Sequence, residues 1–214
     1  MLLGCAAKMQ PDEPVSSPTP ILPAYKATVY TLAPTPPRDP LVLEQVRGFD
    51  LVYDEALSGA ATALALREGQ GLGIESGDVT WACLRSGWPY PLQAYRTAVL
   101  EKDENPKGLL AGLDLRPESK TGLVRARTSD ADVWVLLLSN VPETAEPLAM
   151  QYTLGETLPL PMAAYQNVSH FAVKPTGQRV DLRDPPTLDE AGEWLLEAKR
   201  DGSTLFRAAV YVDM

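Results

Sequence analysis

The chain has few of the residues that build metal sites or disulfide frameworks, since its 214 residues include one histidine and two cysteines. Basic residues are also in the minority, and 19 of them against 28 acidic residues give a formal net charge of −9. This charge repels phosphate backbones, so nucleic-acid binding is not expected. No apolar run has the length of a spanning helix. We therefore expect no metal and no cofactor, and a folded body built from the 45% of residues that are hydrophobic.

The first residues differ in character from the rest of the chain. Leu2 to Cys5 resembles the lipobox of bacterial lipoproteins, in which an apolar stretch ending in Gly or Ala precedes a cysteine that is lipidated. The resemblance implies a lipid anchor on Cys5 and a place at the periplasmic or outer-membrane face of the bacterial envelope. No basic region and no full apolar region precede Cys5, so a lipidated form implies a start upstream of Met1. Without lipidation, we expect a secreted protein in which Cys5 is a free or buried thiol, or bridges to Cys83.

Residues 1–10 form this N-terminus, and residues 11–40 carry nine prolines. Proline removes backbone donors and favours extended conformations, which predicts a semi-rigid spacer. An alternative is a proline-rich ligand for an aromatic groove. Tyr25 to Leu32 interrupts the prolines with an alternating, β-branched pattern that predicts a short strand docked on the body.

The middle of the chain predicts helices. Small and apolar residues at spacings of three and four follow Asp54, and Gly69 ends the pattern. Three further helices are expected from Asp78 to Gly87, from Pro91 through Tyr95 to Leu100, and after Asn105 through Leu109 to Leu113. The glycines between Gly69 and Gly73 do not have the spacing of a dinucleotide loop.

Strand patterns dominate the second half. Residues 122–127 and 133–138 predict a hairpin, and further strands are expected at 158–165, 169–174, 178–182, 193–198 and 204–212. Pro175 to Gly177 and Arg200 to Ser203 supply tight turns. Because helices precede strands, we expect the α+β class, with one domain over 41–140 and a small antiparallel β-sandwich over 147–214 that packs on it.

A family resemblance sharpens this expectation. Leu57, Ala60, Ala61, Leu64 and Ala65 are similar to the first helix of the CAP superfamily (cysteine-rich secretory, antigen 5, pathogenesis-related 1), where the pattern ends in His-Ala. The hairpin from 122 into 133–138 resembles the central strands of that family. The resemblance implies a degenerate CAP-like α/β/α sandwich followed by an immunoglobulin-like module. Leu64 stands where the family has its cavity histidine, so a two-histidine metal cavity is not expected.

Candidate site residues gather on one irregular loop. Arg85, Trp88 and Tyr90 place a basic group and aromatic rings on the segment before Pro91, which predicts a weak binding surface for a sugar or peptide.

The other residues of chemical interest are interpreted as structural. Trp81 and Tyr95 are interpreted as core residues. His170 lacks a nucleophile or orienting acid at a meaningful spacing and is interpreted as structural, and Cys83 as a small buried hydrophobe. The carboxylate pairs at 54–55, 103–104 and 189–190 are interpreted as caps or solvated charges.

These features predict a non-catalytic, lipid-anchored envelope protein that binds a protein, peptide or glycan ligand, with no catalytic residue. The alternatives are a cell-wall hydrolase that uses carboxylates alone, and a secreted domain without an anchor. Two carboxyl groups about 5 to 9 Å apart in a cleft would favour the hydrolase. Nothing in the sequence indicates the oligomeric state.

Overall fold

The computed structural model describes residues 29–30, 39–49, 51–116, 119–141, 148–163 and 165–214. Its helices are α1 (Pro40–Gly48), α2 (Glu55–Gly69), α3 (Ser76–Ser86) and α4 (Lys107–Leu110). The first six strands are β1 (Val29–Tyr30), β2 (Val52–Tyr53), β3 (Ala94–Leu100), β4 (Ser119–Arg127), β5 (Asp132–Asn140) and β6 (Leu148–Ala149). The remaining strands are β7 (Gln151–Tyr152), β8 (Val168–Val173), β9 (Arg179–Leu182), β10 (Gly192–Arg200) and β11 (Ser203–Val212).

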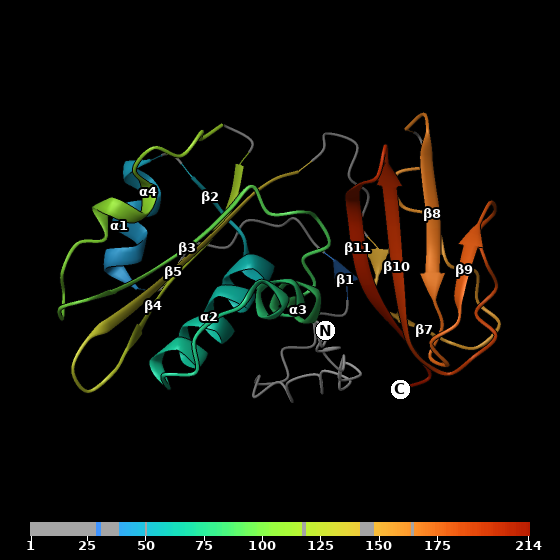
Figure 1. Ribbon diagram of the computed structural model, residues 1–214, viewed down its shortest axis with the longest axis horizontal. Helices are drawn as coiled ribbons and strands as arrows, with labels where there is room; N and C mark the ends of the chain where they lie inside the picture. The colour runs from blue at the N-terminus through green and yellow to red at the C-terminus, as the bar shows by residue number, and fades with distance from the viewer. Residues whose placement is uncertain (1–28, 31–38, 50, 117–118, 142–147, 164) are drawn as a thin grey trace, which may run out of the picture.

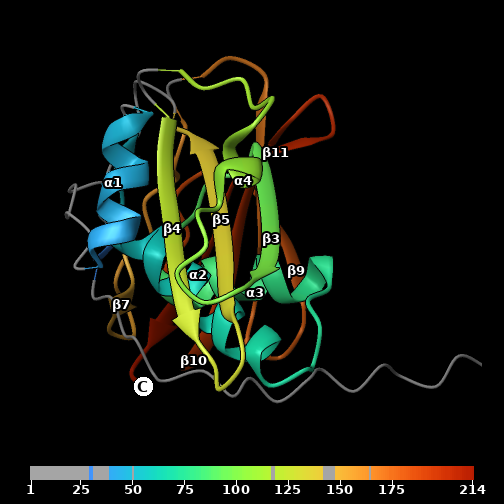
Figure 2. The same ribbon diagram turned by 90° about the vertical axis from the view of Figure 1, so that its left-hand side faces the viewer.

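Two mixed sheets organise the molecule. The first has the strand order β2-β4-β5-β3 and the second β7-β11-β10-β8-β9, and β1 pairs with β6 apart from both. Each sheet contains one parallel pair, β2 with β4 and β7 with β11. Figures 1 and 2 show α1 and α4 on one face of the first sheet, and α2 and α3 on the other face, toward the second sheet.

Helix α2 begins and packs as its sequence predicts. The Asp54 carboxylate accepts hydrogen bonds from the N–H groups of Ala56 and Leu57, at 2.9 and 3.1 Å, which makes it the N-cap. The helix then crosses β4 at Gly122. A Cβ atom on Gly122 would lie 2.3 Å from the backbone carbonyl carbon of Leu57. The absence of a side chain at this position therefore allows α2 to approach the sheet.

Helix α3 ends at a left-handed glycine, which directs the chain toward the second sheet. Gly87 has φ of 82°, a conformation that glycine adopts without steric cost, and Trp88 N–H donates to the Cys83 carbonyl at 2.8 Å. The following segment reaches β11, where Arg207 N–H donates to the Pro89 carbonyl at 2.7 Å. This bond pairs part of an edge of β11 that would otherwise be open.

The second sheet is built on the β10–β11 hairpin. It turns at Asp201 and Gly202, which both have positive φ, as a two-residue hairpin turn requires. Trp194, Leu196 and Ala198 are buried on one face, as their alternation predicts. Leu158 and Leu188 belong to the same cluster. They come from two loops joined by a bridge between residues 157 and 187, and these loops cover that face.

One hydrophobic cluster joins the two sheets. It contains Leu57 and Leu64 of α2, Val135 of β5, and Phe206 and Val210 of β11. The strand-rich tail therefore packs on the helical part of the chain, as its small size predicts. A second cluster lies between the first sheet and helices α1 and α4.

The expected helix from Pro91 to Leu100 is wrong, because Ala94–Leu100 is strand β3. The spacing of Leu92, Tyr95 and Val99 fits a helix, but Tyr95, Thr97 and Val99 also alternate as in a strand. Pairing with the apolar strand β5 over the whole length of β3 decides the outcome. The helix expected after Asn105 is shorter than predicted, since α4 ends at Leu110.

The expected fold class is also wrong. Instead of an α+β, CAP-like sandwich followed by a β-sandwich, the chain forms a mixed α/β structure with two mixed sheets. In the described part of the tail, β7 to β11 form one five-stranded sheet rather than a two-sheet sandwich, β6 pairs with β1, and residues 158–163 do not form the expected strand. Pro159 and Pro161 remove ladder donors there, and Leu158 and Met162 instead cover the sheet from a loop.

Other expectations are confirmed in part. The strands expected at 169–174, 178–182, 193–198 and 204–212 correspond to β8, β9, β10 and β11, and the hairpin at 122–138 to β4 and β5. Within Tyr25–Leu32, residues 29 and 30 form β1. The lipidation site, Cys5, lies outside the described residues. No helix in the described ranges has the length and apolar character needed to cross a membrane.

Candidate functional site

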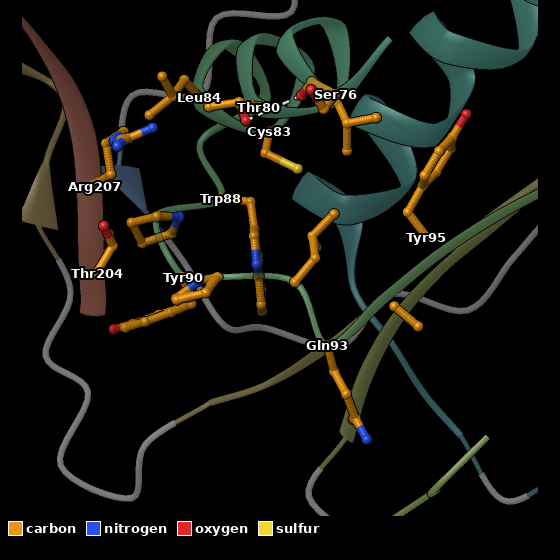
Figure 3. A pocket seen from close by; sticks show the side chains of 15 residues that line it. Ser76, Thr80, Cys83, Leu84, Trp88, Tyr90, Gln93, Tyr95, Thr204 and Arg207 are labelled. Carbon is orange, nitrogen blue, oxygen red and sulfur yellow. Dashed lines mark hydrogen bonds between the residues drawn. The ribbon is translucent and has the colours of Figure 1, made fainter. Parts of the chain in front are cut away.

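A cleft of about 410 Å³ lies where α3, the segment after Gly87, β3 and β11 meet. Figure 3 shows side chains from all of these elements around it. Most of the lining is apolar or aromatic, with a few polar groups at Ser76, Thr80, Gln93, Thr204 and Arg207. A volume of this size falls within the range of small-molecule and side-chain sites, about 300 to 1,000 Å³.

Of the three binding residues proposed from the sequence, the structure places Trp88 and Tyr90 at the cleft and Arg85 outside it. Trp88 and Tyr90 both line the cleft, but their exposed fractions are only 1% and 5%, so they form its wall. The ring of Tyr90 packs edge to face on Trp88 and on Phe206, with centroids 5.7 and 5.8 Å apart. Arg85 is not among the lining residues. Its guanidinium lies 3.4 Å from a Glu193 carboxylate oxygen and from the Tyr211 hydroxyl.

Of the two aromatic residues interpreted as core, Trp81 is exposed, and Tyr95 packs against the core only in part. Trp81 was interpreted as core, but it is 42% exposed, with the Arg85 guanidinium 5.7 Å from its ring centroid. Tyr95 is only half-buried and lines the cleft from β3. Burial raises the pKa of its hydroxyl, and the negative charges of Glu68 and Asp78 add to this, against a hydrogen bond from Thr97. Of these two carboxylates, Asp78 is itself paired with Arg67 at 3.2 Å.

The hairpin of the second sheet contributes Thr204 and Arg207, which the sequence analysis missed. Both side chains donate to the same carboxylate oxygen of Glu197, Thr204 Oγ1 at 3.1 Å and Arg207 Nε at 2.9 Å. Desolvation opposes ionisation of Glu197, but hydrogen bonds from Arg207, Lys199 and Thr204 outweigh it and hold the pKa below its usual range. Arg207 and Lys199 share this one carboxylate, so Glu197 offsets only one of the two positive charges.

Cys83 is buried, as predicted, and lies among the residues that line the cleft. Its exposed fraction is 6%, and desolvation raises the pKa of the thiol to about 12. A thiol in this state is a poor nucleophile, because the thiolate is the reactive form. It is a free cysteine, and its proposed partner Cys5 lies outside the described residues.

His170 has the structural role that its neighbours predict. It lies on β8, 9% exposed, with Nε2 2.6 Å from the Pro161 carbonyl oxygen. Because a carbonyl oxygen only accepts, Nε2 carries the proton. The histidine therefore ties a covering loop to the second sheet.

The carboxylate pairs were expected to be caps or solvated charges, and each departs from this in one respect. Asp103 and Asp189 are exposed but also form ion pairs, Asp103 with Arg125 and Arg127, and Asp189 with Lys174 Nζ at 2.6 Å. Asp54 is the N-cap of α2, as expected, but it is 1% exposed rather than solvated. Desolvation raises its pKa from 3.8 to about 6, although the N–H groups of Leu57 and Ala56 favour the charged form.

Asp54→Asn is expected to remove a pH dependence of stability. A raised pKa in the folded state means that this group favours folding most at low pH, and that its contribution falls as pH rises through about 6. Asparagine retains the capping oxygen without the charge. Denaturant titrations should show the variant gaining up to about 3 kcal/mol over the parent between pH 4 and pH 7. A difference that stays constant over this range would contradict the assigned pKa.

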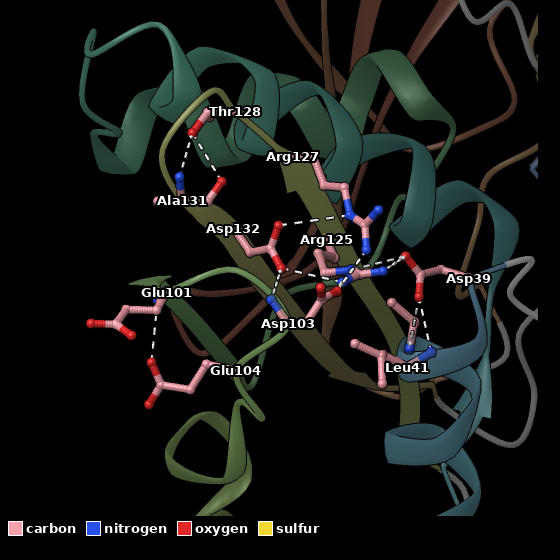
Figure 4. A network of polar contacts seen from close by, with 11 residues as sticks. Asp39, Leu41, Glu101, Asp103, Glu104, Arg125, Arg127, Thr128, Ala131 and Asp132 are labelled. Atoms are coloured by element: carbon pink, nitrogen blue, oxygen red, sulfur yellow. Dashed lines mark hydrogen bonds and ion pairs between the residues drawn. The ribbon is translucent and has the colours of Figure 1, made fainter.

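A second polar cluster is structural rather than a site. The Arg125 guanidinium, 6% exposed, contacts Asp39 at 2.9 Å, Asp103 at 2.8 Å and Asp132 at 3.2 Å. Figure 4 shows these carboxylates converging on it, with Arg127 beside Asp103. Because Asp39 is the N-cap of α1, Asp103 follows β3 and Asp132 begins β5, the cluster joins these three segments to β4. Each of its carboxylates has a guanidinium partner.

A second cleft of about 350 Å³ lies on the α4 side of β3. Its lining includes Ala98 and Leu100 of the strand, Pro106 and Leu109 near α4, and Glu104. Arg96 also contributes, and its guanidinium donates to the carbonyls of residues 108, 109 and 111, at 3.4, 3.0 and 2.6 Å. Arg96 is thereby held against the C-terminal end of α4, where a cation is favourable.

Within the described ranges, no group of three or more His, Cys, Asp or Glu side chains is placed to hold a metal ion. No family model matches the chain, and no curated protein or solved structure matches it either, so nothing identifies a CAP domain.

Proposed function

We propose that this is a non-catalytic binding protein whose ligand occupies the 410 Å³ cleft between α3, β3 and β11. The observation that carries the proposal is the convergence of Thr80, Tyr95 and Thr204 from three distant segments on one concave, mostly apolar surface. Ligand sites commonly have this character, an apolar lining with a few placed polar groups. A peptide or a glycan with an apolar face fits such a surface.

The chemistry of the lining favours binding over hydrolysis. A carboxylate-dependent hydrolase needs two carboxyl groups on either side of the scissile bond. The residues that line the larger cleft include no Asp or Glu, and the smaller cleft has Glu104 alone. The raised pKa of Asp54 belongs to a helix cap outside both clefts. The proposed anchor on Cys5 and the envelope location rest on the Leu2–Cys5 motif, which lies outside the described residues.

The experiment is to fill the cleft and measure ligand binding. A display library of random dodecapeptides and an oligosaccharide array, both screened against the full chain, supply the probes. Thr80 is half-buried on α3 and lines the cleft, with Oγ1 3.2 Å from the Ser76 carbonyl oxygen. Thr80→Trp should place an indole in the cleft and lower the affinity of selected ligands by at least about tenfold.

Thr62 offers a matched control. It is exposed on α2, outside the cleft, and its hydroxyl makes the same kind of bond, to the Ser58 carbonyl four residues earlier at 2.8 Å. Thr62→Trp should leave affinity unchanged, and both variants should melt within a few degrees of the parent. The proposal fails if selected ligands bind the Thr80→Trp and Thr62→Trp proteins equally, or if neither library yields a ligand.

A further inference from the structure

Strand β3 forms an open edge of the first sheet. It pairs with β5 over all seven of its residues without a register shift, and within the described residues it pairs with no other strand. Figure 2 shows it at the side of the sheet, away from β4. Thr97 and Val99 are exposed, Val99 by 59%. A long, regular and exposed edge is a template for another strand.

The edges formed by β2 and β9 lack this character. Strand β2 is only two residues long, and β9 has four, among them Arg179 and Asp181. Short edges and charged edge residues discourage strand addition. The one charged side chain of β3, that of Arg96, is held by the carbonyl groups near α4. Its charge therefore does not block the edge.

The two clefts lie on opposite faces of this edge. Tyr95 packs with the cluster of α2 and α3 and lines the larger cleft, whereas Ala98 and Leu100 pack with the cluster of α1 and α4 and line the smaller one. Successive side chains of a strand point to opposite faces of its sheet. A strand added along β3 would therefore direct one side chain into each cleft, at positions an odd number of residues apart.

The charges beside the edge indicate what kind of strand fits. At one end the negative charge of Glu68 acts on Tyr95, whereas Asp78 is already paired with Arg67 at 3.2 Å, and Glu104 lines the smaller cleft at the other end. Two copies of this chain, each with a net charge of −9, would repel one another. Within the proline-rich segment 11–40, residues 29 and 30 already pair with β6 as β1, and the stretches on either side of 24–33 carry prolines, which lack the ladder donor. A basic partner avoids both difficulties.

We infer that the ligand is an extended, basic peptide that adds to the edge of β3 as a fifth strand of the first sheet and places apolar side chains in the two clefts. The inference rests on the proposed function and specifies its ligand. Main-chain hydrogen bonds supply affinity in this mode of recognition, and the clefts select the side chains. Added salt should weaken the complex, because part of the attraction is between exposed charges.

The test uses a peptide selected from the dodecapeptide library and amide exchange of the full protein followed by NMR. Alternate amides of Ala94–Leu100, those that face away from β5, should exchange at least about tenfold more slowly in the complex. N-methylation of the peptide at every second residue should lower affinity by at least about tenfold. Methylation at the intervening residues is the matched control and should have little effect.

The outcomes separate the two proposals. If a peptide or glycan binds and Thr80→Trp weakens it, but the β3 amides keep their exchange rates, the cleft is a binding site and strand addition is wrong. Methylation effects without alternation would also overturn strand addition. If the β3 amides become protected with increasing protein concentration and no peptide, a second copy occupies the edge and the inference fails. If no ligand is found, the proposed function itself fails.

Discussion

Gly122→Ala is expected to lower the free energy of unfolding by about 3 kcal/mol. The new Cβ would lie 2.3 Å from the carbonyl carbon and oxygen of Leu57 and 2.7 Å from the Ser58 nitrogen. These are backbone atoms of α2, so no side-chain rotation relieves the contact. The helix must move away from β4, which disturbs the buried packing of Leu57, 0% exposed. A loss of this size is a large part of the stability of an ordinary domain.

Gly77→Ala is the control, because a Cβ at this position in α3 meets nothing within 4 Å. Alanine is the better helix former, so this variant should be more stable than the parent by about 0.5 kcal/mol. Urea titrations of both variants measure the difference. Equal stability of the Gly122→Ala protein and the parent would show that α2 does not approach the sheet at this position.

Trp194→Ala is expected to cost about 3 to 5 kcal/mol. The indole is 1% exposed at the centre of the second sheet, and its Nε1–H donates to the Glu190 carbonyl at 2.9 Å. Removing it leaves a cavity and an unpaired carbonyl beneath the covering loops. Trp81→Ala removes the same side chain from an exposed position, 42% exposed, and should cost less than about 1 kcal/mol.

The shape of the thermal unfolding transition of the Trp194→Ala protein tests whether the two sheets share one core. Because Trp194 and the α2 residues Leu57 and Leu64 belong to one hydrophobic cluster, the whole protein should melt in one transition at a lower temperature. Scanning calorimetry gives the result directly. A second transition at the parent temperature would mean that the first sheet and its helices unfold independently of the tail.

The sequence predicted those helices and strands whose signals lie within a few neighbouring residues. The start of α2 follows from one capping carboxylate, Asp54, and the β10–β11 hairpin follows from a two-residue turn between alternating strands. Strand β3 was missed because its spacing suits either element, and β5, the partner that decides between them, lies over thirty residues later in the chain. The covering of the five-stranded sheet by loops, in place of a second sheet, was missed because loop coverage has no periodic signal.

The sequence predicted only the wall of the cleft that the segment after Gly87 forms, and not the wall that β11 forms. The segment with Trp88 and Tyr90 drew attention through its aromatic residues and prolines, and both residues do form the cleft wall. Thr204 and Arg207 carry no local signal, since an alternating strand with a threonine and an arginine is ordinary. Their place at the cleft depends on the bond between Arg207 N–H and the Pro89 carbonyl, a contact between residues distant in the chain.

The buried thiol of Cys83 offers a way to measure how often the junction between the two sheets opens. Cys83 belongs to the cluster that joins the sheets and is only 6% exposed where it lines the cleft, so alkylation is expected to be slow while α3 stays packed on its neighbours. In the absence of ligand, its alkylation rate therefore reports how often the junction opens. Comparing that rate with the rate of global unfolding distinguishes a junction that opens locally from one that opens only when the whole protein unfolds.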